Sequence, residues 1–215
     1  IRSRMLSHLM HIDDGLADTV ANGLGLPLPE KAKAAVSPKT DLPPSDALSI
    51  VKNGPKAFAG RKLGLLLSDG ADAALVKALM DAVKAADALC EVIAPKIGGA
   101  TLSDGTLLPA QQKIDGGPSV LYDAVAVIVS DEGAALLSKD APSKDFVADA
   151  FAHCKFMGLS PEAKPLLVNA GIAEDLDDGC LGLQSADDAK AFVAALGPLR
   201  FWDRESKVDL DAMTD

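Results

Sequence analysis

The stretch His-Cys-Lys-Phe-Met-Gly-Leu-Ser-Pro-Glu, residues 153–162, carries the residue types best suited to nucleophilic chemistry. A short apolar run leads there into a turn at Ser160–Pro161, and many α/β enzymes mount their nucleophile where a strand turns sharply into a helix. At the top of such a strand, Ser160 would lie near backbone N–H groups able to bind an oxyanion. The stretch therefore predicts either a catalytic elbow or only the frame of one.

Ser160 lacks the partners that a serine nucleophile needs. Such a serine requires a base within hydrogen-bond reach, and His153 comes before the strand, toward the opposite end of the sheet. The glycines that flank the serine of a GxSxG elbow are also missing. We therefore favour the interpretation that Ser160 caps the helix that begins at Pro161.

The three cysteines, Cys90, Cys154 and Cys180, are better explained by packing than by reactivity. Cys154 lies at the end of a predicted helix, whereas a thiolate is favoured at a helix N-terminus. Cys90 lies inside a predicted strand, and Cys180 follows a glycine-rich turn without a base nearby. No CxxC pair occurs, which argues against a zinc site or disulfide framework and favours reduced cysteines in the cytoplasm.

Several acidic residues follow predicted strands or precede predicted helices. Asp72 either acts as an acid in a pocket or caps the helix that begins there, and its spacing favours the cap. Asp131–Glu132 is likewise interpreted as a cap. The pairs Asp13–Asp14, Asp177–Asp178 and Asp187–Asp188 are typical of solvated caps and helix faces rather than of metal sites.

These residues are positioned by strands that alternate with helices from Arg61 onward. The predicted strands are 62–67, 88–95, 123–129, 156–159 and 179–183, with a hairpin turn at Asp104–Gly105 and a final helix over 186–202. The alternation indicates an α/β fold, a doubly wound and mostly parallel sheet covered by helices on both faces. Because sites in such sheets form beyond the carboxyl ends of the strands, we expect Ser68–Asp72, Ser130–Gly133 and Leu159–Glu162 to surround one pocket.

The first part of the chain has a different character. Residues 1–24 show the apolar spacing of two short helices, the second capped by Asp13 or Asp14 and ended by Gly23 and Gly25. Residues 26–46 are rich in proline and predict a semi-extended linker. The apolar stripes of two such short helices require a further partner to bury them.

Composition excludes some classes of partner. Lys+Arg 21 against Asp+Glu 31 gives a net charge of −10, which argues against nucleic acid and anionic membranes as partners. No apolar run reaches the roughly 20 residues of a membrane span, and no signal-peptide pattern opens the chain. Because the chain begins at Ile1, we expect it to be a piece of a longer protein or a processed product.

Several segments, taken in order, carry a resemblance to a known family. The segments "RKLGLLLSDGADAALVKAL", "GTLLPA", "YDAVAVIV" and "HCKFMGLSPEAK" resemble the DJ-1/PfpI branch of flavodoxin-like domains. The leader "RMLSHLMHIDDGLADTVANGLGLPLP" is similar to the last helices and linker of large-subunit haem catalases, which carry a DJ-1-like domain at their C-terminus. The resemblance covers essentially the whole chain. It implies four parts: the end of a catalase helical region (1–25), a proline-rich linker (26–59), a flavodoxin-like domain (60–203) and a C-terminal tail (204–215).

The resemblance also bears on activity. Active DJ-1/PfpI members place a cysteine at the elbow and a glutamate after the first strand, and here those positions fall at Ser160 or Pro161 and near Asp72. The histidine that often follows the elbow cysteine is missing, and the Pro-Gly-Gly turn after the third strand is replaced by Ser130–Glu132. The resemblance therefore implies a pseudo-enzyme in which Ser160 and Asp72 are degenerate site positions.

The resemblance places the chemistry in another part of the parent, a catalase that converts hydrogen peroxide to water and oxygen. Haem would bind the missing core, because Tyr122 lies outside the family's haem-ligand motif and no distal-histidine motif is present. The implied partners are that core and the other subunits of a homotetramer, and unfolded client proteins if the domain holds them as a chaperone does. Two rival hypotheses are a free-standing DJ-1-like enzyme for small carbonyl or amide substrates, and a small-ligand module that binds, for example, FMN.

Overall fold

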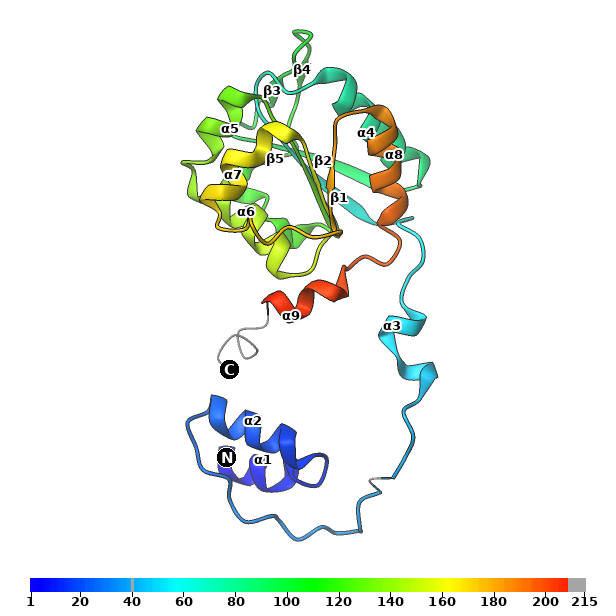
Figure 1. Ribbon diagram of the computed structural model, residues 1–215, viewed down its shortest axis with the longest axis vertical. Helices are drawn as coiled ribbons and strands as arrows, with labels where there is room; N and C mark the ends of the chain where they lie inside the picture. Colours follow the sequence, from blue (N-terminus) through cyan, green and yellow to red (C-terminus); the bar gives the residue numbers. More distant parts are fainter. Residues whose placement is uncertain (40, 209–215) are drawn as a thin grey trace. The chain divides into compact units, whose positions relative to one another are not determined.

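The five predicted strands after Arg61, together with a short polar strand that the sequence did not predict (β5), form a six-stranded sheet with the order β5-β2-β1-β6-β7-β8, seen in the computed structural model of Figure 1. The strands are β1 (Lys62–Leu67), β2 (Leu89–Ala94), β5 (Gln112–Lys113), β6 (Ala124–Ile128), β7 (Met157–Leu159) and β8 (Cys180–Gly182). Every neighbouring pair is parallel. The chain builds outward from β1 first toward β2 and then toward β6, so the predicted α/β class and parallel sheet are confirmed.

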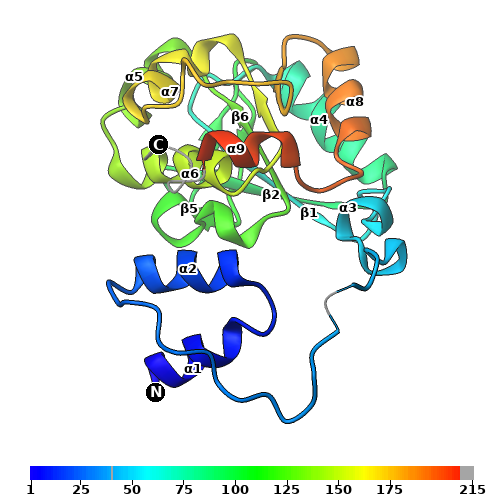
Figure 2. The same ribbon diagram turned by 60° about the horizontal axis from the view of Figure 1, so that its bottom comes forward.

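Helices cover both faces of this sheet (Figure 1). The helices are α4 (Ala73–Ala85) and α8 (Ala186–Ala195) on one face, and α5 (Asp131–Leu137), α6 (Ala141–Ala152) and α7 (Lys164–Asn169) on the other. Figure 2 shows α4 and α8 side by side, in keeping with their direct packing. The central strands are thus buried on both faces, as their unbroken apolar runs predicted.

Two apolar clusters lie on the two faces of the sheet. Successive residues of β1 alternate between them: Leu65 belongs to the cluster with α4 and α8, and Leu66 to the cluster with α5, α6 and α7. Both side chains are fully buried. Burying a leucine side chain contributes about 1.5–3 kcal/mol to folding, so the two leucines tie both helical layers to the same strand.

Shorter elements complete this part of the chain. Strands β3 (Ala100–Thr101) and β4 (Leu107–Leu108) form the predicted antiparallel hairpin, with Gly105 at a φ of 86° in its turn. The remaining short elements are η2 (Ile114–Gly116), η3 (Ser119–Leu121), η4 (Pro161–Ala163), η5 (Trp202–Arg204) and α9 (Glu205–Val208).

The final helix is shorter than predicted. It ends at Ala195 rather than continuing to residue 202. Pro198 cannot continue a helix, and Leu199 adopts a left-handed φ of 64°. The chain is thereby redirected toward η5.

The structure describes residues 1–39 and 41–208, and the chain divides into two compact units, Ile1–Asn53 and Gly54–Asp215. The predicted tail at 204–215 lies partly outside the described residues. None of the helices within the described ranges is long and apolar enough to span a bilayer.

The first unit contains α1 (Arg2–Leu9), α2 (Asp14–Gly23), η1 (Asp46–Leu48) and α3 (Ile50–Asn53). Asp13 caps α2 by accepting a hydrogen bond from the N–H of Leu16 (2.7 Å), which resolves the predicted choice between Asp13 and Asp14. The first part of the linker packs against the helix pair, where Nε2 of His11 donates a hydrogen bond to the carbonyl of Ala32 (2.6 Å). The sequence did not predict η1 and α3, whose apolar side chains are all exposed.

Candidate functional site

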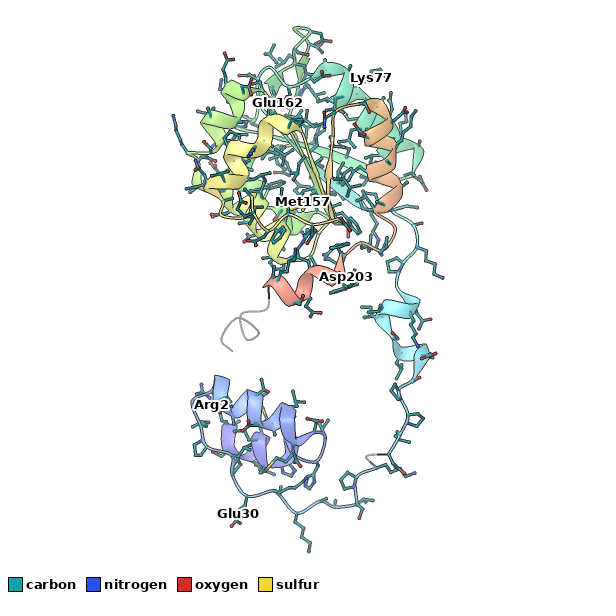
Figure 3. All side chains as sticks on the ribbon, viewed as in Figure 1. Arg2, Glu30, Lys77, Met157, Glu162 and Asp203 are labelled. Atoms are coloured by element: carbon teal, nitrogen blue, oxygen red, sulfur yellow. The ribbon has the colours of Figure 1, made fainter. Side chains whose placement is uncertain are left out.

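The carboxyl ends of β1, β6 and β7 lie next to one another and line a small cavity of about 270 Å³. Its lining includes Gly70, Asp72, Ser103, Ser130, Asp131, Ser160 and Glu162. All three segments expected to surround a pocket contribute to it. Figure 3 shows Glu162 at this end of the domain, with Met157 inside it and Asp203 at the opposite end.

Ser160 is held by backbone rather than by catalytic partners. Its side chain is buried, and its Oγ accepts a hydrogen bond from the N–H of Val129 (3.3 Å). Its own N–H donates to the carbonyl of Val127 (2.9 Å). Ser160 does occupy the predicted N-cap position of the helical turn that begins at Pro161, but it makes no side-chain capping bond to η4, because its hydroxyl bonds to the end of the neighbouring strand instead. No described histidine, lysine or cysteine forms a hydrogen bond with it.

Asp72 is exposed and caps α4. Its carboxylate accepts a hydrogen bond from the N–H of Leu75 (2.8 Å), so the capping alternative is confirmed. The neighbouring Asp69 also serves the backbone, because its Oδ1 accepts from the N–H of Thr101 (2.8 Å). The carboxylate of Asp72 thus caps its own helix, and that of Asp69 joins the loop after β1 to β3 of the hairpin.

Two serines fill the crevice between β1 and β6, where doubly wound sheets usually bind ligands. Ser68 Oγ accepts from the N–H of Ser130 (3.1 Å), and Ser130 Oγ donates to the carbonyl of Asp69 (2.7 Å). Gly133 packs on this pair so closely that a Cβ there would lie 1.9 Å from Ser68 Oγ. The crevice is therefore lined by short polar side chains in contact with backbone.

Ser130 rather than Asp131 or Glu132 caps α5, since its Oγ accepts from the N–H of Gly133 (3.1 Å). Both acidic residues lie in the first turn of that helix, where their negative charges interact favourably with the positive end of the helix dipole. The prediction of an acidic cap was therefore wrong by one position. The sequence does contain the correct signal, because Ser130 directly precedes the helix and serine is a preferred N-cap residue.

A second cavity of about 290 Å³ lies beside the first, between the ends of β1 and β2 and the start of α5. Its charged lining residues are Asp69, Lys96 and Glu132. Lys96 Nζ lies 3.9 Å from Asp69 Oδ2, and both side chains are mostly exposed. An exposed ion pair of this kind contributes little to binding or stability.

The thiols have the properties of packed side chains. Burial raises the pKa of Cys90 to about 12, with the charge of Glu91 as a second cause. Burial likewise raises the pKa of Cys154 and of Cys180. Because the thiolate is the reactive form, these shifts disfavour nucleophilic chemistry at neutral pH. Cys154 follows α6 with a left-handed φ of 54°, so it ends the helix as a glycine commonly does.

Tyr122 does not fit the role of a haem ligand. Its hydroxyl donates to Glu91 Oε2 (3.2 Å), and burial, together with the charge of Glu91, raises its pKa, whereas iron binds the tyrosinate form. Its ring covers Gly64, where a Cβ would come within 2.5 Å of it. Among the described residues, no group of three or more His, Cys, Asp or Glu side chains could hold a metal ion.

Among the described residues, the side chain with the most hydrogen bonds lies at the opposite end of the sheet, and no sequence pattern points to it. Arg204 is fully buried; its Nη1 donates to the carbonyls of Phe151 (3.2 Å) and Lys155 (2.8 Å), and its Nη2 donates to Cys180 Sγ (3.3 Å). Its guanidinium carbon lies 4.2 Å from the centre of the Phe151 ring. These contacts anchor the end of the described chain to the end of α6, to the segment before β7 and to the first residue of β8.

Comparison with known proteins places this architecture in a family. Residues 59–206 match the family described as the C-terminal domain found in long catalases. The chain is 53% identical to Catalase C of Rhizobium meliloti over 211 residues, covering 98% of this chain and 30% of that protein. It is 33% identical to Catalase HPII of Pseudomonas putida (97% and 29%) and 34% identical to Catalase HPII of Mycobacterium avium (96% and 31%).

The chain thus spans about three tenths of the length of these relatives. The similarity extends over both of its units, since the matched segments cover nearly all its residues. The chain therefore belongs to the family of C-terminal domains found in long catalases.

Proposed function

We propose that this chain is the non-catalytic C-terminal region of a long haem catalase and that its work is physical. The parent would convert hydrogen peroxide to water and oxygen at a haem held in the rest of the protein. The region would stabilise the assembled enzyme or shape the route by which peroxide and solvent reach the core. The observation that carries this proposal is the hydroxyl of Ser160, which accepts from the N–H of Val129 and, among the described residues, forms no hydrogen bond with a histidine, lysine or carboxylate.

The flavodoxin-like, DJ-1/PfpI-like identity of the second unit is part of the proposal. It is supported by the sheet, in which β2, β1, β6, β7 and β8 follow one another as the 2-1-3-4-5 order typical of flavodoxin-like folds does. The residues that follow the strands at this end of the sheet support the proposal that the domain is a pseudo-enzyme. Ser68, Ser130 and Ser160 use their hydroxyls to hold backbone, so the fold would keep the frame of a site without its reactive groups.

The first unit supports a role within a larger assembly. Met5, Ile12 and Leu16 of the helix pair expose 47%, 71% and 44% of their surface. Apolar side chains exposed together mark surfaces that other protein covers. We propose that the catalase core and the other subunits of a homotetramer cover them, in the cytoplasm, where the three free cysteines would stay reduced.

The proposal is tested first by the coding sequence upstream of Ile1, which should encode a haem-catalase core. The complete parent is then compared with a form that ends at residue 53. We expect equal peroxide turnover per haem at low temperature and faster thermal inactivation of the short form, because a domain that binds only the native assembly stabilises it. A short form that loses turnover per haem while its assembly and inactivation rate stay unchanged would refute a purely physical role.

The same exposed side chains favour a second role as a holder of unfolded client proteins. The assay is light scattering from a heat-denaturing client with and without this chain at equimolar ratio. Suppression of aggregation that falls when Ile12 is replaced by Ser would support the role. If the client aggregates equally fast with and without the chain, the chaperone-like role is rejected.

A further inference from the structure

The dipeptide Asn-Gly occurs twice in the described chain, at Asn22–Gly23 and at Asn53–Gly54. Asn-Gly is chemically labile because glycine has no side chain to shield its nitrogen from the neighbouring amide. The two copies lie in different structural settings. We propose that Asn53–Gly54 is a site of spontaneous deamidation and isoaspartate formation, and that Asn22–Gly23 is protected.

The chemistry requires only the chain and water. The backbone nitrogen of Gly54 attacks the side-chain carbon Cγ of Asn53, a C–N bond forms, and the bond from Cγ to Nδ2 breaks. Ammonia leaves with the proton given up by the Gly54 amide. Water then opens the five-membered ring at either carbonyl, which yields aspartate or isoaspartate at position 53 with no change of oxidation state.

The setting of Asn53 permits the required backbone rotation. It is the last residue of α3, a single turn whose residues are all exposed and which buries no side chain. A helix this short is marginal in water and opens at little cost. Asn53 can thus leave the helical backbone angles, which hold the nitrogen of the next residue away from Cγ.

Asn22 lies in a helix that tertiary packing holds. It belongs to α2, which has ten residues and buries Ala17 and Ala21 against α1. The carbonyl of Asn22 also accepts the N–H of Gly25 in the turn that ends the helix (2.9 Å). Ring closure at Asn22 therefore requires local unfolding of a packed helix, which costs more than opening α3.

Conversion at Asn53 would also change the linker. Nδ2 of Asn53 donates to the carbonyl of Ser49 (3.1 Å) and to that of Asp46, and these bonds join η1 to α3. Aspartate or isoaspartate would present a carboxylate oxygen to the same carbonyls. Two donor contacts would thereby become repulsive, so the turn over residues 46–53 would open after conversion.

The test uses the full chain, incubated at mildly alkaline pH and then digested with an endoprotease that cleaves before aspartate. The sequence yields one peptide over 46–68, which contains Asn53, and another over 18–40, which contains Asn22. Mass spectrometry detects conversion as the replacement of an amide by an acid. Conversion to aspartate also creates a new cleavage before residue 53, whereas isoaspartate does not.

We expect position 53 to convert at least about tenfold faster than position 22, because their local opening energies differ. The exposed variant Asn53→Gln should abolish this product, since glutamine closes its ring far more slowly, and leave the 18–40 peptide unchanged. Equal conversion at both positions would refute the proposal. So would an unconverted Asn53 in the folded chain under conditions in which a free peptide of residues 46–56 converts.

Discussion

The guanidinium of Arg204 and the carboxylate of Asp177 form a bidentate ion pair beneath the amino ends of β7 and β8. Nε lies 2.9 Å from Oδ2, and Nη2 lies 2.8 Å from Oδ1. The Arg204 side chain is fully buried and that of Asp177 is 9% exposed. With two carbonyls and one sulfur as further acceptors, all five N–H groups of the guanidinium have a partner.

Replacement of Asp177 by Asn should destabilise the chain strongly. The variant leaves the buried charge of Arg204 uncompensated, a change that typically costs about 3–5 kcal/mol. The free energy of unfolding from urea titration measures the effect. The matched control is Asp187→Asn, which breaks an exposed pair with Lys190 and should leave the unfolding midpoint unchanged. Equal midpoints for both variants would mean that the buried pair contributes no net stability.

The same pair should resist acid. Burial acts to raise the pKa of Asp177, but the hydrogen bonds and charge of Arg204 outweigh it and hold the pKa below its usual value. The folded pKa is thus depressed, so the contribution of the pair is full above the unfolded pKa and is lost as pH falls through the folded one. Urea midpoints of the native chain and of Asp177→Asn should therefore converge only in strong acid. Convergence already at pH above the usual aspartate range would contradict the lowered pKa.

Lys155 provides a prediction at the other end of the pH scale. It is buried, and its Nζ donates to the carbonyls of Ser119 (2.5 Å) and Tyr122 (2.7 Å). Burial lowers its pKa from 10.5 to about 8, with the charge of Arg200 as a second cause. Between those two values the unfolded chain holds a proton that the folded chain has released, so this residue makes stability rise with pH.

The variant Lys155→Met removes that dependence, and its loss of hydrogen bonds to two carbonyls should cost about 1–3 kcal/mol. Unfolding free energies of both proteins, measured at a series of pH values from 7 to about 11 to bracket the proton release, give the difference. The raised pKa values of the thiols act in the opposite direction but are common to both proteins, so they cancel. A difference that does not change with pH would show that the Lys155 pKa is not lowered by folding.

The features that the sequence predicted correctly depend on neighbours along the chain. The strands of the parallel sheet show as apolar runs because both of their faces are buried. Asp72 caps α4 through Leu75, three positions away, and the hairpin turn depends on Asp104–Gly105 itself. A pattern over a few residues contains all the information that such local structures require.

The features that it missed depend on contacts between distant parts of the chain. Ser160, which follows β7, accepts a hydrogen bond from Val129, which follows the neighbouring strand β6. Arg204 donates to Asp177, which lies 27 residues earlier in the chain. No local pattern tells which of several acidic residues such an arginine reaches. The final helix, which ends at Ala195 and not at residue 202, is an error of another kind. Pro198 is a local stop signal, and the prediction gave more weight to the apolar periodicity on either side of it.

The close approach of Gly133 to Ser68 predicts that the crevice at the strand tops tolerates no added methyl group. Gly133→Ala would place a Cβ 1.9 Å from Ser68 Oγ and should cost about 1–3 kcal/mol, because overpacking forces neighbouring side chains to shift. Gly98→Ala is the control, since a Cβ there meets nothing within 4 Å. Thermal unfolding compares the two. If Gly133→Ala is as stable as the control, the crevice has room that the structure does not show.

Reactivity of the cysteines separates the structural proposal from a free-standing enzyme. Desolvation raises the pKa of Cys90, Cys154 and Cys180, so each should react slowly with a thiol reagent at neutral pH; Cys154 is buried and should react only when the chain opens, whereas the other two are half-buried. The measurement is the labelling rate of the native chain beside that of the chain in denaturant. We expect full labelling in denaturant, slower labelling of every thiol in the folded state, and labelling of the buried Cys154 at least about 100-fold slower, as is typical of groups that react only through opening. The single variant Cys154→Ser should remove one slow site and leave the rates of the other two unchanged. A native thiol that reacts as fast as in denaturant, and whose removal abolishes turnover of a small carbonyl substrate, would instead establish the enzyme.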